Sequence, residues 1–200
     1  MTSASLCDDR GATGFSWTID ELMQRTSHAL AVDGRVWLID PTDEPIALSR
    51  IAELGEPAGV LQLLDRHGRD CEAVAERLGV AHHVCPATGS GTPFAFHRLT
   101  WRPWWREVAL WWEAERLLVV PEAVGTGRYF TVGRGVVGVH PMLRLMPPRR
   151  LLHFTPHTLL VGHGRAVRGD QASDSLHEAI ADARRGIPAV VRSIPSLRHR

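Results

Sequence analysis

The sequence predicts a layered α/β fold with mixed sheets, on three grounds. Hydrophobic residues make up 44% of the 200 residues and charged residues 22%, a globular composition in a chain long enough for one sizeable core. Runs with the two-residue period of strands alternate with runs that have helical spacing. A hairpin, a helix, a strand, a helix, several strands and a final helix follow one another, which favours helices layered on sheets.

The first half of the chain starts with a hairpin. Asp33-Gly34 lies between two β-rich runs, and both residues of such a turn need positive φ. Two amphipathic stretches each stop at a glycine, which is typical of a helix C-terminus. The expected elements are strands at 27–32 and 35–40, a helix at 46–54, a strand at 59–64, a helix at 70–78 and a strand at 82–85.

The second half is expected to be mainly strands. Three of them have short linkers and should form an antiparallel meander. Residues 121–150 are rich in Gly, Pro and Arg and show only weak periodicity. Ser173 is expected to cap the last helix. The expected elements are strands at 94–101, 107–112, 116–120 and 158–161 and a helix at 173–185.

Charge and cysteine content argue against several classes of partner. Lys and Arg number 23 against 22 Asp and Glu, and this net charge of +1 gives no reason to expect nucleic acid or an anionic membrane. Three cysteines without CxxC spacing fit a reducing compartment. No run approaches the roughly 20 apolar residues of a membrane span, and residues 1–14 do not form a signal peptide. We therefore expect a cytoplasmic protein.

Five segments, in order, resemble the metallo-β-lactamase superfamily. They are Ile39-Asp40-Pro41 after a hairpin, Asp65-Arg66-His67-Gly68-Arg69-Asp70-Cys71 after a strand, Pro103-Trp104-Trp105-Arg106-Glu107, Val119-Val120-Pro121-Glu122, and Leu160-Val161-Gly162-His163-Gly164. The last four stand where that family has T-H-x-H-x-D-H, P-G-H-T, a strand ending in a metal-bridging Asp, and a late G-H-G. The resemblance covers roughly residues 26–186. It implies one domain over 1–200, a four-layer αββα sandwich with loose N- and C-terminal ends.

Position by position, the resemblance implies that the first of the family's two metal sites is lost. Its three histidines fall at Arg66, Gly68 and Trp105, which offer zinc no ligand atom. The second site retains side chains that can all bind zinc. Its four positions are Asp70, Cys71, Glu122 and His163. The implied cofactor is therefore either none or one zinc ion.

The same residues also allow a site without metal. Asp70 is then a helix N-terminal residue favoured by the dipole, Cys71 is a small buried hydrophobe, and His163 caps a turn. Arg66 replaces the lost cation and contacts Asp70 or Glu122. In a third, thiol-dependent alternative, the helix N-terminus lowers the pKa of Cys71 and favours its thiolate.

Aromatic residues are expected beside this site. We expect one of Trp111 and Trp112 in the core, and Trp104 and Trp105 at a cleft or surface. The residues of this cleft and former metal site are Arg66, His67, Gly68, Trp104, Trp105 and His140.

Two functions are compatible with these residues. The first is a non-catalytic protein that has lost the two-metal centre and binds a small molecule or a partner in the cleft. The second is a one-zinc hydrolase in which the ion lowers the pKa of water toward about 7 for attack on an ester, thioester or lactone-type bond. The sequence assigns no catalytic residue, substrate or oligomeric state.

Overall fold

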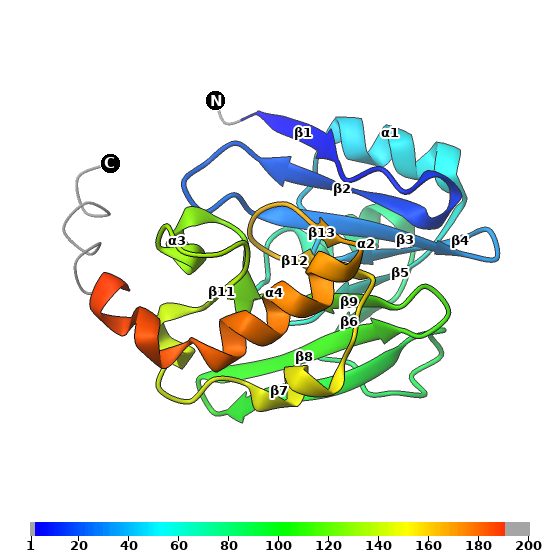
Figure 1. Ribbon diagram of the computed structural model, residues 1–200. Coiled ribbons are helices and arrows are strands. Elements are labelled where there is room, and N and C mark those ends of the chain that lie inside the picture. Colours follow the sequence, from blue (N-terminus) through cyan, green and yellow to red (C-terminus); the bar gives the residue numbers. More distant parts are fainter. Residues whose placement is uncertain (1–2, 191–200) are drawn as a thin grey trace.

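The computed structural model describes residues 3–190, which form two large sheets with helices on their outer faces (Figure 1). The first sheet has the strand order β1-β2-β3-β4-β5-β6. Its strands are β1 (Ala4–Cys7), β2 (Gly14–Ile19), β3 (Thr26–Val32), β4 (Arg35–Ile39), β5 (Glu56–Gln62) and β6 (His82–Val84). The first four strands pair antiparallel, whereas β4, β5 and β6 run parallel.

Local sequence accounts for the connections of this sheet. The hairpin between β3 and β4 turns at Asp33 and Gly34, both with positive φ, which confirms the predicted turn. Helix α1 (Pro45–Leu54) connects β4 to the parallel β5, and α2 (Cys71–Leu78) connects β5 to β6. Helix α2 ends at Gly79 in the left-handed conformation, as its sequence predicts.

The second sheet has the order β13-β12-β9-β8-β7. Strands β7, β8 and β9 form the predicted antiparallel meander, and β12 then pairs parallel with β9. A two-stranded ribbon of β10 and β11 stands beside it. The bounds are β7 (Ala95–Arg102), β8 (Trp105–Trp112), β9 (Leu117–Val120), β10 (Val124–Gly125), α3 (Arg128–Thr131), β11 (Gly138–Val139), β12 (Thr158–Val161), β13 (Val167–Arg168) and α4 (Asp170–Ala181). Short 3-10 turns cover Gly11–Thr13, Pro141–Leu143, Arg149–His153 and Arg184–Gly186.

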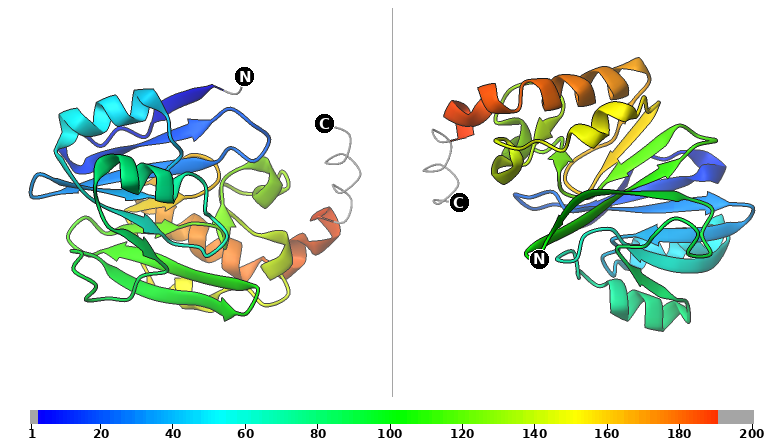
Figure 2. Two further views of the ribbon diagram at one scale, coloured as in Figure 1. Left: turned by 180° about the vertical axis from the view of Figure 1, so that it is seen from behind. Right: turned by 90° about the horizontal axis from the view of Figure 1, so that it is seen from below.

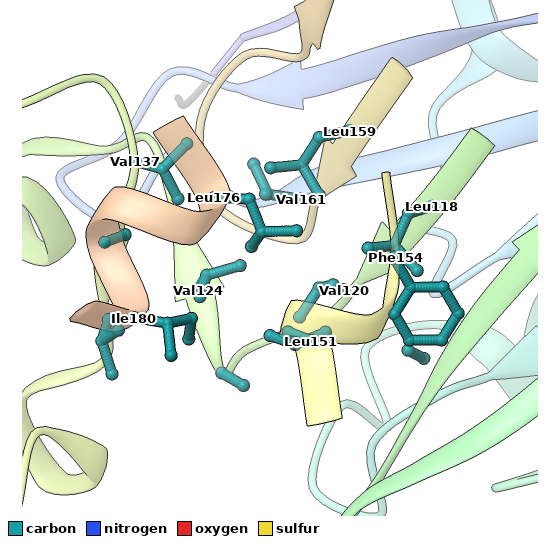
Figure 3. Close-up of a cluster of buried hydrophobic side chains, with 14 of the residues drawn as sticks. Leu118, Val120, Val124, Val137, Leu151, Phe154, Leu159, Val161, Leu176 and Ile180 are labelled. Atoms are coloured by element: carbon teal, nitrogen blue, oxygen red, sulfur yellow. The ribbon is translucent and has the colours of Figure 1, made fainter. Parts of the chain in front are cut away.

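Three hydrophobic clusters define four layers, which are visible edge-on in the right view of Figure 2. One cluster joins α1 and α2 to the first sheet through residues such as Ile51 and Val74. The second fills the space between the sheets and includes Trp37 and Trp112. The third joins α4 to the second sheet, where Leu176 and Ile180 pack toward Val161 and Val124 (Figure 3). The order is therefore helices, sheet, sheet, helix, which confirms the predicted αββα sandwich.

The ends of the chain differ from the prediction. Residues 4–19 are not loose: β1 and β2 extend the first sheet, and Phe15 and Trp17 are buried. The sequence gives little sign of these two strands, because small and polar residues interrupt their apolar residues. Ser173 does not cap α4, because the helix starts earlier, at Asp170 after Gly169. The predicted loose C-terminal tail lies largely outside the described residues. Within residues 3–190, no helix is both long and apolar enough to cross a membrane.

Candidate metal centre

Four strands point their carboxyl ends at one edge of the sandwich. Asp40 directly follows β4, and His67 lies in the loop after β5. Glu122 lies two residues after the end of β9, and His163 lies two residues after the end of β12. The two late strands approach so closely that a Cβ on Gly162 would lie 2.1 Å from the backbone oxygen of Pro121. The glycine therefore allows the contact that brings His163 beside Glu122.

The carboxylate of Glu122 is the centre of a buried cluster. His67 Nε2 lies 2.7 Å from Glu122 Oε2, and His163 Nε2 lies 3.0 Å from the same oxygen. One ligand atom from each of these three residues falls within 4.8 Å of the others. All three residues are buried, so the cluster forms a preorganised group of two imidazoles and one carboxylate.

The outer nitrogens of the two imidazoles are held by acceptors. His67 Nδ1 lies 3.2 Å from Asp40 Oδ2, and His163 Nδ1 lies 2.9 Å from the backbone oxygen of Met23. A carbonyl only accepts, so His163 Nδ1 carries the proton, and the Asp40 carboxylate assigns the same role to His67 Nδ1. In a neutral ring this leaves the lone pair of Nε2 facing Glu122, whereas a protonated ring donates a hydrogen bond from Nε2 to the carboxylate. This is the arrangement in which outer partners orient histidine ligands toward a metal ion.

His140 has the opposite orientation. Its Nδ1 accepts a hydrogen bond from the backbone N–H of Met142, so the proton of the neutral ring is on Nε2. This nitrogen lies 3.3 Å from Glu122 Oε1. Burial lowers the pKa of His140 to about 4; the charge of Glu122 opposes this shift and the charge of Arg66 adds to it. His140 therefore places a neutral imidazole beside the second carboxylate oxygen.

The electrostatics of the cluster keep Glu122 ionised. Burial alone would raise the pKa of Glu122, but the hydrogen bonds from His163 and His67 outweigh it and hold the pKa well below its usual range. Burial and the charge of Arg69 would lower the pKa of His67. The bonds of its ring to Asp40 and Glu122 reverse that effect and raise it. The cluster therefore favours positive charge between the imidazoles and the carboxylate.

Glu107 fixes the backbone on which Glu122 stands. Its Oε1 accepts the backbone N–H groups of Glu122 at 3.0 Å and of Ala123 at 2.7 Å, and its Oε2 accepts the indole N–H of Trp105 at 2.7 Å. The side chain is fully buried, and burial raises its pKa to about 7 although these bonds oppose the shift. Glu107 thereby links β8 to the segment after β9.

Arg69 brings a fixed positive charge behind the cluster. Its guanidinium donates to the backbone oxygens of Thr26 at 2.8 Å, Asp40 at 2.9 Å and Gly162 at 3.0 Å, and so joins the two sheets. Arg69 and Asp40 both have positive φ, 39° and 43°, which costs energy in residues other than glycine. Such strained positions are concentrated at functional sites, which fits their place here.

The structure brings together only two of the four ligands expected from the resemblance. Glu122 and His163 are in the cluster. Asp70 is exposed, and its carboxylate accepts the backbone N–H of Asp43 at 2.9 Å. Cys71 is buried in the hydrophobic cluster under α2. Gly68 has no side chain and lies at an exposed turn between Arg66 and Asp70. The candidate ligand group therefore contains His67 in place of the expected Asp70–Cys71 pair.

The expectations for Arg66 and the tryptophans also need correction. In the part of the chain that the structure describes, Arg66 makes no ion pair with Asp70 or Glu122. Its guanidinium instead lies 4.1 Å from the ring centroid of Trp105. Trp104 is exposed as predicted, but Trp105 is fully buried because its indole N–H is bonded to Glu107. Trp112 takes the expected place in the core.

Cys7 and Cys71 are buried and Cys85 is half-buried, and burial disfavours the thiolate form of a cysteine. Burial raises the pKa of Cys7 to about 12 and that of Cys85 to about 11. Burial, followed by the charge of Asp40, raises the pKa of Cys71 even further, so the expected thiolate at the start of α2 is wrong. We predict that a thiol reagent such as Ellman's reagent at pH 8 reacts slowly with the folded protein and rapidly with all three cysteines in guanidinium. A fast native phase that disappears in Cys71→Ser would contradict this assignment.

Sequence reasoning missed four contributions to the site. His67 and His140 were expected near the cleft, but neither was identified as a partner of Glu122. Arg69 was given no role. Met23 contributes its backbone carbonyl, and the identity of a side chain does not tell which group the backbone oxygen at that position will bind. A buried strand running into a histidine was the only local sign that His67 could face inward.

Comparison with known proteins gives a fold assignment. No protein-family model and no curated protein matches the sequence. The DIM-1 metallo-β-lactamase superposes with a TM-score of 0.59 and 11% identity over 92% of this chain and 97% of its own. A structure named as diflavin flavoprotein A 5 from Nostoc sp. PCC 7120, a fragment, gives 0.67 and 13% over 96% and 99%. The BLEG-1 B3 metallo-β-lactamase gives 0.55 and 15% over 80% and 96%.

Proposed function

We propose that this chain, which has the metallo-β-lactamase fold, holds one zinc ion on His67, Glu122 and His163 and is a hydrolase of ester, thioester or lactone-type bonds. The observation that carries the proposal is the orientation of the two imidazoles. Their outer nitrogens are bound by Asp40 and by the carbonyl of Met23, so their inner lone pairs face a carboxylate.

A nitrogen lone pair and a carboxylate oxygen repel each other at close range unless a cation lies between them. Without one, two acceptors oppose each other at 2.7 and 3.0 Å, which is unfavourable in a buried site. The cation is either a proton on each ring or a metal ion. Two imidazole nitrogens and one carboxylate oxygen are the protein ligands of a common class of catalytic zinc site, which leaves one position for water. The donor set therefore fits zinc.

A bound zinc ion acts as a Lewis acid that polarises a carbonyl group and activates water. The residues of the chain supply the rest. Asp40 and the backbone carbonyl of Met23 hold the imidazole tautomers, and the ring of His140 lies beside Glu122 Oε1, with its Nε2 3.3 Å away. Arg69 supplies positive charge at the back of the site, so a second metal ion would meet a fixed cation. These features support one ion rather than two.

Metal analysis with matched variants tests this function. We expect about one zinc per chain after reconstitution, and hydrolysis of 4-nitrophenyl acetate that depends on it. His163→Ala should lose both, because a three-ligand site keeps only two of its ligands. Asp70→Asn should keep both, since its carboxylate caps a loop outside the cluster. Zinc that survives in His163→Ala would contradict the site. A zinc-free wild-type protein with a ligand in its cleft would favour the binding function instead.

A further inference from the structure

Arg66 carries a guanidinium that the protein leaves open. Its side chain is exposed, and the structure shows no hydrogen bond or ion pair to it from residues 3–190. Nevertheless it has a defined place, with its guanidinium carbon 4.1 Å from the ring centroid of Trp105. Stacking on an aromatic face leaves the N–H donors at the edge of the guanidinium free. Arg66 is therefore a positioned cation with unused donors.

The surface under Arg66 is rigid. Trp105 is fully buried, and its indole N–H is held by Glu107 at 2.7 Å. The same Glu107 holds the backbone of Glu122, the metal ligand of the proposed site. The guanidinium and the ligand are therefore positioned by one buried carboxylate, which limits the movement of one relative to the other.

Arg66 lies next to the proposed zinc site. It directly precedes His67 in the chain, and the Trp105 ring under it lies 5.0 Å from the ring of His140, whose Nε2 lies 3.3 Å from Glu122 Oε1. Trp104, 55% exposed, packs edge-on against Trp105 and adds an apolar rim. A molecule that reaches the ligand cluster from this side meets a free guanidinium beside an aromatic surface.

We propose that Arg66 determines specificity by binding an oxyanionic group of the substrate, a carboxylate or a phosphate. This inference rests on the proposed zinc hydrolase and names its substrate class: an ester, thioester or lactone that carries such a group near the bond to be broken. A planar guanidinium binds carboxylate and phosphate through two parallel hydrogen bonds, which gives orientation as well as affinity. The exposed ring of Trp104 suits an apolar portion of the same molecule.

Binding of simple anions to the zinc-loaded protein tests the assignment. Calorimetric titrations would use succinate, inorganic phosphate and neutral succinamide as probes. Arg66→Gln should weaken the preferred anion about ten-fold, the effect of losing a charge-assisted hydrogen bond, and leave zinc affinity unchanged. Arg66→Lys should give an intermediate loss, because ammonium keeps the charge without the planar fork. Arg106→Gln is the control, since that exposed arginine pairs with Asp65 at 3.3 Å.

The outcomes separate the two proposals. Failure of the wild-type protein to bind zinc would overturn the proposed function. Normal zinc binding with equal anion affinities in wild type and Arg66→Gln would overturn only the role of Arg66. If neutral succinamide bound as tightly as succinate, the negative charge would not matter for binding, and the role of Arg66 would again be overturned. Preference for succinate or for phosphate identifies which oxyanion the site accepts, and either preference supports the inference if Arg66→Gln abolishes it.

Discussion

Replacing Asp40 by asparagine is expected to lower the zinc affinity about 10- to 100-fold, the usual loss when an outer partner of a histidine ligand is changed. Asp40 Oδ1 accepts the backbone N–H of Leu63 at 2.9 Å, and Oδ2 faces His67 Nδ1 at 3.2 Å. Asparagine keeps one oxygen for Leu63 and turns an NH₂ group toward the ring. His67 Nδ1 must then accept, which moves the ring proton to Nε2 and removes its lone pair from the ligand cluster.

The backbone at this position tolerates the change. Asp40 has a φ of 43°, and asparagine is among the few residues that adopt this conformation readily. Zinc affinity would be measured by competition with a chromogenic chelator, with the thermal transition of the metal-free protein as the test of folding. Asp43→Asn is the control, because Asp43 pairs with Arg77 near the surface. Equal zinc affinity in Asp40→Asn and Asp43→Asn would show that Asp40 does not set the orientation of His67.

Replacing Glu107 by alanine is expected to destabilise the fold by about 3–5 kcal/mol. The change leaves three buried N–H groups without their acceptor, on Glu122, Ala123 and Trp105. Each orphaned donor costs about 1–3 kcal/mol, although such costs are not fully additive, and the lost side chain leaves a cavity. Zinc binding should also weaken, since the segment that carries Glu122 loses its anchor.

Guanidinium denaturation of the metal-free protein measures this effect. Glu107→Gln should lose less, because its carbonyl oxygen can still accept from Glu122 and Ala123 while its NH₂ opposes the indole N–H of Trp105. Glu115→Ala, an exposed glutamate in the turn between β8 and β9, should stay within about 0.5 kcal/mol of wild type. A loss under about 1 kcal/mol in Glu107→Ala would mean that water replaces the carboxylate at no great cost.

Much of the fold follows from the sequence because its signals are local. Periodicity placed both internal helices and the meander, and Asp33-Gly34 predicted the hairpin, since a turn that needs positive φ at two successive residues accepts few sequences. The strands at residues 4–19 were missed because small and polar residues alternate there without a strong apolar run. Strand β2 forms because β3 offers it a partner, and β1 forms because it pairs with β2 in turn. These pairings are not local in sequence.

From the sequence, the resemblance to the metallo-β-lactamase superfamily singled out Glu122 and His163 as candidate site residues, because each stands where that family has a metal ligand. The parallel pairing of β9 and β12 then places both residues at one edge of the sheet. Only the tertiary structure decided the third ligand. In the loop after β5, Arg66, His67, Gly68 and Arg69 follow one another, and spacing alone cannot say which side chains face inward. The turn directs His67 to Glu122 and Asp40, directs Arg69 to carbonyls of both sheets, and leaves Arg66 on Trp105. Those directions depend on partners up to 93 residues away, which no local pattern encodes.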